Sequence, residues 1–211
     1  MKLANHQFGQ AIRLFQVHGL SGTLYGPNLT RAFESKYGFL EGPRTVPQYD
    51  STKGIVFQHG LFEGVVIDKL TIFNDGLVCE TKVDTDIADR FFDNALEWAQ
   101  TEAGWKITDD RVAKAGRMYT SRVDVQADIG LDHAIKGFSE IGAAISEAVK
   151  RYGVDTPSNF LPASIDLHYD FPASQRAVTP FSFARLVGQP WSERRYLSSA
   201  PLRTTDHLRI L

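Results

Sequence analysis

Segments with the two-residue period of β-strands alternate along this chain with two segments that have the 3.6-residue period of helices. The two helical segments lie at 84–103 and 132–152. Because each amphipathic element must bury its apolar side, this order predicts an α+β fold. We expect a two-layer sandwich, with a mainly antiparallel sheet and both helices on one face. The strand-like segments are 54–62, 64–73, 77–83, 117–128, 163–171 and 179–187.

Both helical segments have recognisable ends. Asp84 and Asp86 can cap the first helix, where their charge also suits the positive end of the helix dipole. Gly153 is the expected stop of the second helix. Seven residues share one apolar stripe on that second helix, which we expect to pack on the sheet. They are Ile135, Phe138, Ile141, Ile145, Ala148, Val149 and Tyr152.

A hairpin is predicted where Asn74-Asp75-Gly76 separates two strand-like segments. A type I′ turn needs two residues with positive φ, and Asp and Gly tolerate that conformation. Cys79 follows in the second of these strands, beside apolar neighbours, so we expect a packed thiol rather than a reactive one.

The 211 residues suit one domain with additional segments. We expect an N-terminal appendage over 1–53, an α+β core domain over 54–187 and an irregular C-terminal arm over 188–211. The appendage contains a strand-like segment at 10–17, and the pattern leaves open whether that strand joins the main sheet. A short helix is expected at 28–36.

Composition and charge exclude several classes of protein. The formal net charge is −2, so no global field would draw the chain to nucleic acid or to a membrane surface. Cys79 is the only cysteine, which excludes an intrachain disulfide. Polar residues interrupt residues 1–20, so no signal-peptide core is expected there. We therefore expect a soluble, cytoplasmic protein without membrane contacts.

Charge is unevenly distributed along the chain. Residues 84–110 hold eight acidic side chains and two basic ones, whereas residues 171–211 hold six arginines and two acidic residues. Such segments can pair within one chain or between two chains, and the pattern leaves both open. The basic segment also interleaves aromatic residues, as single-strand nucleic-acid binders do, but it has no lysine. We expect protein contacts here rather than nucleic-acid binding.

One constellation could carry chemistry. Asp166, His168 and Asp170 alternate along a predicted strand, so a period of two places all three on one face. Carboxylates and an imidazole could hold a divalent metal, or a carboxylate could orient His168 as a general base. The same alternation is also the ordinary solvent face of a half-buried strand. Asp124 and Asp128 could complete a metal site if their strand pairs with this one, and His133 could join them.

No nucleophile elbow, phosphate loop, paired C-x-x-C or dinucleotide fingerprint occurs in the chain. The first hypothesis is therefore a noncatalytic protein that self-assembles, or binds a partner protein, through the appendage and the arginine-rich arm. The alternative is a metal-dependent hydrolase or small-ligand enzyme that uses Asp166, His168 and Asp170. The residues expected at the interface are Trp191, Arg194, Arg195, Tyr196 and Arg203.

Overall fold

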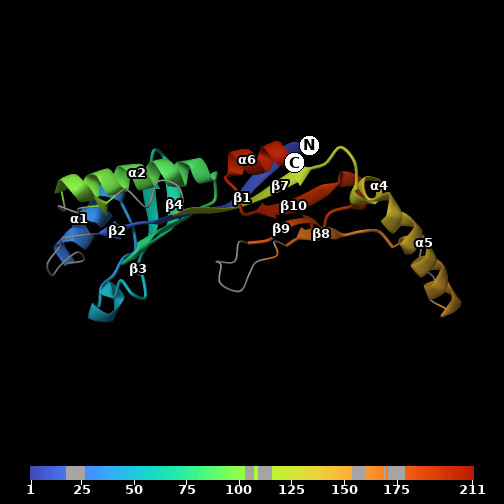
Figure 1. Cartoon of the computed structure of the whole chain (residues 1–211), viewed down its shortest axis with the longest axis horizontal. Helices are drawn as coiled ribbons and strands as arrows, with labels where there is room; N and C mark the ends of the chain where they lie inside the picture. The colour runs from blue at the N-terminus through green and yellow to red at the C-terminus, as the bar shows by residue number, and fades with distance from the viewer. Residues whose placement is uncertain (18–26, 103–106, 109–115, 154–159, 169, 171–178) are drawn as a thin grey trace. The chain divides into compact units, whose positions relative to one another are not determined.

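The computed structural model describes residues 1–17, 27–102, 107–108, 116–153, 160–168, 170 and 179–211 (Figure 1). The chain forms two compact units. The first unit consists of Met1–Asn5 and Val123–Ala200, and the second consists of His6–Arg122 and Pro201–Leu211. These boundaries differ from the expected ones after residues 53 and 187, and the expected division stays a prediction.

The α+β class and the antiparallel sheet are confirmed. The sheet has eight strands in the order β3-β4-β5-β1-β7-β10-β9-β8, and β2 pairs with β6 separately. The described helices are α1 Pro27–Tyr37, α2 Thr85–Glu102, α4 Leu131–Ala134, α5 Lys136–Arg151 and α6 Thr204–Ile210. The described strands are β1 Lys2–Leu14, β2 Gln16–Val17, β3 Ile55–Phe62, β4 Val65–Phe73, β5 Gly76–Thr81, β6 Ile107–Thr108, β7 Arg117–Gln126, β8 Ser164–Leu167, β9 Phe181–Arg185 and β10 Arg195–Ala200.

The hairpins β3–β4 and β4–β5 both form. The turn with positive φ values joins β3 to β4, whereas it was expected between β4 and β5. Between β3 and β4, Glu63 and Gly64 have φ values of 50° and 77°, as a type I′ turn requires. In the β4–β5 hairpin, neither Asn74 nor Asp75 has a positive φ. Gly76 serves a different purpose, because a Cβ atom there would lie 2.6 Å from the carbonyl oxygen of Arg13 on β1. The expected type I′ turn at Asp75-Gly76 was therefore wrong, although the hairpin was right.

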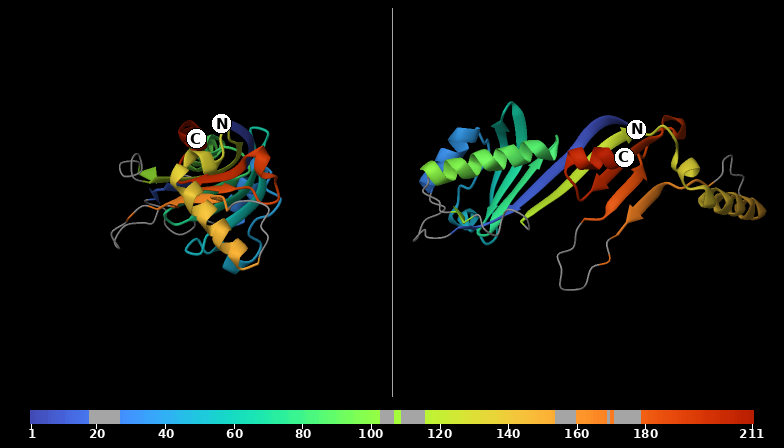
Figure 2. Two further views of the ribbon diagram at one scale, coloured as in Figure 1. Left: turned by 90° about the vertical axis from the view of Figure 1, so that its right-hand side faces the viewer. Right: turned by 45° about the horizontal axis from the view of Figure 1, so that its top comes forward.

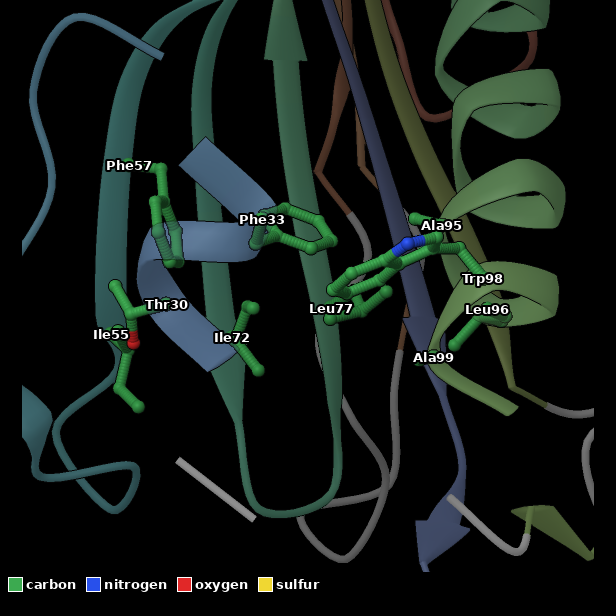
Figure 3. A pocket seen from close by; sticks show the side chains of 10 residues that line it. All are labelled: Thr30, Phe33, Ile55, Phe57, Ile72, Leu77, Ala95, Leu96, Trp98 and Ala99. Carbon is green, nitrogen blue, oxygen red and sulfur yellow. The ribbon is translucent and has the colours of Figure 1, made fainter. Parts of the chain in front are cut away.

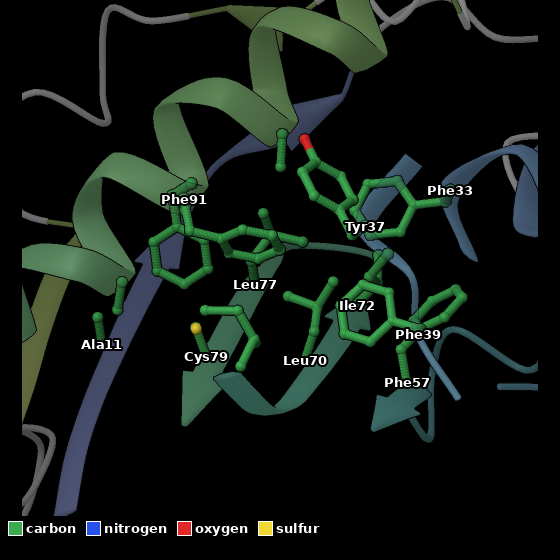
Figure 4. Packing of buried hydrophobic residues seen from close by; sticks show 14 of the residues in the cluster. Ala11, Phe33, Tyr37, Phe39, Phe57, Leu70, Ile72, Leu77, Cys79 and Phe91 are labelled. Atoms are coloured by element: carbon green, nitrogen blue, oxygen red, sulfur yellow. The ribbon is translucent and has the colours of Figure 1, made fainter. Parts of the chain in front are cut away.

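The core of the second unit lies between its strands and the helices α1 and α2 (Figure 4). The side chains of Phe91, Leu70 and Cys79 are fully buried there. The helix ends follow local sequence: the carboxylate of Asp84 accepts the backbone N–H of Ile87 at 3.0 Å, as expected of an N-cap. Burial raises the pKa of the Cys79 thiol, and the prediction of a packed thiol is confirmed.

Both ends of the chain contribute to regular structure. β1 is longer than the expected strand at 10–17, and it pairs antiparallel with β5, with Ala11 opposite Cys79. The residues 188–211 were expected to be irregular, yet they contain β10 and α6. β10 pairs with β9, with Tyr196 opposite Arg185. On its other side β10 lies next to β7, a strand far away in the sequence, and no local pattern predicts such a partner.

The second expected helix forms as two pieces, α4 and α5, separated at Ile135. Gly153 has a φ of 79°, consistent with the predicted stop. In Figures 1 and 2, α5 projects away from strands β8, β9 and β10 and does not cover them. The expectation that its apolar stripe packs on the sheet therefore differs from the structure.

Candidate functional site

The largest group of exposed apolar side chains on a single described helix lies on α5. Phe138, Ile141 and Ile145 are 52%, 54% and 42% exposed, and Tyr152 follows directly after the helix and is also exposed. The spacing of three and four residues places them along one side of the helix. We call Phe138, Ile141, Ile145, Ala148 and Tyr152 the α5 face. Contiguous exposed apolar surface is typical of sites that contact another protein, a membrane or a ligand.

A strip of α5 beside the apolar face is covered by its own chain. The backbone N–H of Phe160 donates to Ser146 Oγ at 3.0 Å, and that hydroxyl donates to the Gly142 carbonyl at 2.8 Å. Gly142 is required here, because a Cβ atom at that position would collide with the carbonyl of Phe160. The helix therefore has one covered side and one apolar side in contact with solvent.

Charged residues flank the α5 face in an asymmetric order. Glu140 lies near the start of the helix, whereas Lys150 and Arg151 lie in its last turn. Arg151 also pairs with Glu147 one turn earlier, at 3.8 Å, and both side chains are 75% exposed. Exposed pairs of this kind contribute little to stability, so these groups can take other partners.

The predicted catalytic and metal residues on β8 are exposed. Asp166 lies within β8, whereas His168 and Asp170 come after the strand has ended. Because β8 ends at Leu167, only Asp166 of the three lies in the strand. The expected alignment of all three on one strand face is therefore absent. Among the residues that the structure describes, no group of three or more His, Cys, Asp or Glu side chains is placed to hold a metal ion.

The further metal ligands considered from sequence are bound by other groups. Asp124 is buried and accepts two hydrogen bonds from Arg195, one of them from Nε at 3.0 Å. Asp128 accepts the Met1 ammonium group at 2.9 Å, and His133 lies 3.5 Å from Asp132. The sheet order also separates β7 from β8 by β10 and β9. The strand pairing on which the metal hypothesis depended is therefore not formed.

The five predicted interface residues make contacts within their own chain. The ring of Tyr196 is buried and stacks on Phe183, and its hydroxyl accepts the Leu131 N–H at 3.1 Å. Arg194 donates to the Asp128 carbonyl, and Arg195 binds Asp124. Trp191 is 42% exposed, and the guanidinium of Arg185 lies 4.1 Å from its ring centre. Arg203 binds the carboxylate of Asp89 at 2.9 Å.

The sequence analysis missed a partly buried ionic network in the second unit. Asp89 of α2 accepts Arg13 at 3.2 Å, Arg203 at 2.9 Å and the Tyr119 hydroxyl at 2.8 Å. Arg13 also pairs with the carboxylate of Asp93. Burial raises the pKa of Tyr119, and its hydrogen bond raises the pKa of Arg203. The available signal was Arg13 itself, a charged residue that alternates with Ala11 and Phe15, both of which are buried.

Helix α6 is held to the second unit by polar groups. Thr85 and Thr204 exchange hydrogen bonds, since each backbone N–H donates to the other hydroxyl, at 3.1 and 2.9 Å. Ser121 Oγ and His207 Nδ1 lie 2.7 Å apart, and both residues are fully buried. A buried serine and histidine cannot reach a substrate, so this pair is structural.

The second unit also contains an apolar pocket between α1, α2 and the strands β3, β4 and β5 (Figure 3). Its volume, which includes solvent at its mouth, is about 450 Å³. Ligand sites combine an apolar lining with a few placed polar groups, whereas this lining is almost entirely carbon. We therefore read the pocket as incompletely filled core. The lining residues are Thr30, Phe33, Ile55, Phe57, Ile72, Leu77, Ala95, Leu96, Trp98 and Ala99.

Comparison with protein-family models, curated proteins and solved structures finds no match to this chain. Within the described residues, no helix is both long and apolar enough to cross a lipid bilayer.

Proposed function

We propose that this chain is a noncatalytic protein that assembles with further copies of itself through the α5 face. The observation that carries the proposal is the exposure of Phe138, Ile141 and Ile145 on one side of a helix. Fully burying one such side chain contributes about 1.5–3 kcal/mol. Each of these three side chains is about half exposed, so about half of that free energy can still be gained when a partner covers it. Over the three residues this amounts to a few kcal/mol.

The charged C-terminal arm supports assembly less well than the α5 face does. Arg194, Arg195 and Arg203 each bind an acceptor of their own chain, and Tyr196 is buried. A contact between chains would have to displace these interactions or add to them. Covering the exposed side chains of the α5 face breaks no ion pair, so assembly through it gains the free energy of their burial without such a loss.

Absolute mass by light scattering after size exclusion tests the proposal, at two protein concentrations and at low and high salt. We expect a discrete oligomer that persists at high salt, because apolar contacts are not screened. The double variant Ile141→Asp/Ile145→Asp should be monomeric with unchanged helix content by circular dichroism. The matched control is Val187→Asp, which changes an exposed apolar residue outside α5.

Three results would contradict this proposal in different ways. A wild-type chain that is monomeric at both concentrations overturns self-assembly. An oligomer that dissociates at high salt, and that is insensitive to the α5 changes, shifts the contact to the charged arm. A control variant that dissociates as readily as the α5 variant removes the assignment to this helix.

A further inference from the structure

We infer that strand β8 pairs with the β8 strand of a second copy, antiparallel, with Ile165 of both chains at the two-fold axis. The contact joins copies within the oligomer that the α5 face forms. The inference therefore rests on the proposed function and adds a second contact to it. It follows from the hydrogen-bonding register of β8 and from the exposure of its outer edge.

The outer edge of β8 is uncovered. β8 is the last strand in the order of the sheet, and no strand lies beyond it among the residues that the structure describes (Figure 1). Ser164 and Asp166 are exposed, and Leu167 is 60% exposed. At the opposite edge, the backbone of Gln58 on β3 exchanges hydrogen bonds with that of Glu41, at 2.9 and 3.3 Å. An uncovered edge presents backbone groups that another strand can bind.

The register with β9 decides which backbone groups of β8 are free. Continuing that register by one position places Ala163 opposite Arg185, whose N–H donates to the Ala163 carbonyl at 2.7 Å. Hydrogen-bonded pairs alternate with non-hydrogen-bonded pairs along an antiparallel ladder, so Ile165 also directs its backbone groups to β9. Ser164 and Asp166 therefore direct theirs to the outer edge.

Three registers bring Ser164 and Asp166 of two copies into backbone pairing, and one of them fits. With Ser164 at the axis, Asp166 would lie opposite the partner's Pro162, which has no N–H to donate. With Asp166 at the axis, two carboxylates would lie directly opposite each other, which is destabilising. With Ile165 at the axis, Ser164 lies opposite the partner's Asp166, twice by symmetry.

This third register satisfies backbone and side chains together. Each Ser164 exchanges backbone N–H and carbonyl hydrogen bonds with the partner's Asp166. The hydroxyl of Ser164 also lies within reach of that carboxylate and can donate to it. On the other face of the sheet the two Ile165 side chains meet, and Leu167 packs against the partner's Ala163. The exposed edge of one β8 strand is therefore complementary to the same edge of a second copy.

The strand pair is too small to hold two copies together without a further contact. β8 has four residues, whereas stable interfaces bury about 1,200–2,000 Å². Association through the α5 face raises the local concentration of β8 edges, so the strands pair within the oligomer.

Disulfide formation between single introduced cysteines tests the register. Cys79 is the only native cysteine and is buried, so the wild-type chain gives a clean background. At the axis, the two Cα atoms of residue 165 would lie about 4.5 Å apart, within the range of a disulfide. We expect Ile165→Cys chains to cross-link to one another on mild oxidation.

The matched control is Leu167→Cys, on the same strand and the same face. Leu167 is more exposed than Ile165, so chance collisions would favour the control. In the inferred register the two Cα atoms of residue 167 lie four positions apart along the paired strands, or about 13 Å, and should not cross-link.

Substitutions at Ser164 give an independent readout. Ser164→Asp places two acids opposite each other, twice by symmetry, and should slow cross-linking of the Ile165→Cys chain about fivefold. Ser164→Lys places a base opposite each acid and should speed cross-linking by about the same factor. Ser192→Asp, at an exposed site outside β8, is the matched control and should leave the rate unchanged.

The outcomes separate this contact from the proposed function. Cross-linking of Ile165→Cys without cross-linking of Leu167→Cys, with opposite effects at Ser164, supports the strand pair. An oligomer in which neither variant cross-links, or in which both do, overturns the strand pair and leaves assembly through α5 intact. Equal cross-linking in the Ile141→Asp/Ile145→Asp background overturns the dependence on the α5 face. A monomeric wild-type chain, together with an Ile165→Cys chain that does not cross-link, overturns both the inference and the proposed function.

Discussion

Ser121 and His207 are separated by 86 positions in the chain, yet Ser121 Oγ lies 2.7 Å from His207 Nδ1 in a fully buried contact. Burial lowers the pKa of His207 to about 4, so the folded chain holds this ring in its neutral form. The contact joins β7 to α6, and it makes the docking of the C-terminal helix dependent on the protonation state of one ring.

The first prediction concerns stability against pH. The unfolded chain protonates His207 near its ordinary pKa of 6.5, whereas the folded chain does so only near 4. Protonation between these values therefore favours unfolding. We expect stability to be complete above pH 6.5 and to fall as the pH drops toward 4, by roughly 3 kcal/mol at most. Urea unfolding at several pH values measures this. The variant His207→Gln should lack that part of the slope, and an unchanged slope would contradict the assignment.

The second prediction concerns the partly buried ionic network around Asp89. Asp89→Asn removes the charge that Arg13 and Arg203 share, and it leaves the Arg13 side chain, which is 5% exposed, with Asp93 as its only acid. We expect destabilisation of about 1–3 kcal/mol, because the buried Arg13 loses one of its two acids and its charged hydrogen bond to Asp89. Chemical denaturation measures it. The isosteric control Glu63→Gln breaks the exposed pair with Arg90 and should cost less than about 1 kcal/mol. Equal costs for both variants would refute a special role for Asp89.

The third prediction concerns the apolar pocket. Ala99 of α2 lines the pocket, and Ala99→Leu places new methyl groups into that space without loss of helix propensity. We expect stabilisation of about 1 kcal/mol, measured as a rise in Tm and in the urea midpoint. Ala88→Leu is the matched control, because Ala88 is fully buried on the same helix but does not line the pocket. Overpacking there should cost about 1–3 kcal/mol. If Ala99→Leu destabilises as much, the space is not open in solution.

The fourth prediction concerns metal binding. Asp124 is held by Arg195, and the described part of the chain places no three potential ligands together. We expect no stoichiometric metal in the purified protein and no change in Tm on adding Mg²⁺, Mn²⁺ or Zn²⁺. A saturable rise in Tm that disappears in the Asp166→Asn and His168→Asn variants would restore the metal-enzyme alternative.

Local interactions explain why the elements could be predicted. The Asp84 cap, the stop at Gly153 and the β4–β5 hairpin depend on residues within a few positions of one another. The alternation of β7 and the stripe of α5 were also readable, because each follows from the geometry of a single element. The predicted turn type of the β4–β5 hairpin was wrong. Gly76 is needed because β1 approaches it closely, and not because the turn requires a positive φ.

The candidate sites could be predicted only in part. The residues of the α5 face were named from their spacing, but their exposure was not foreseen. Asp124 was considered as a ligand, and it is the buried partner of Arg195. Arg203 was assigned to an interface between chains, and it binds Asp89 within its own chain. A charge pattern gives the sign of the net charge of a segment, but it does not identify the group that pairs with each charged residue.

The sequence by itself determined the two long amphipathic helices, the early hairpins and the apolar side of each, because those properties depend on neighbours along the chain. It did not determine β10 and α6 in the segment 188–211. Only the tertiary structure decided which of those apolar sides would be covered. α2 and α5 have similar amphipathic patterns, yet Phe91 is fully buried and Ile141 is exposed. The reason is that burial requires a second surface from a distant part of the chain, as in the Thr85–Thr204 contact across 119 positions. The α2 helix has such a surface in its own unit, and we propose that α5 obtains one from a second copy.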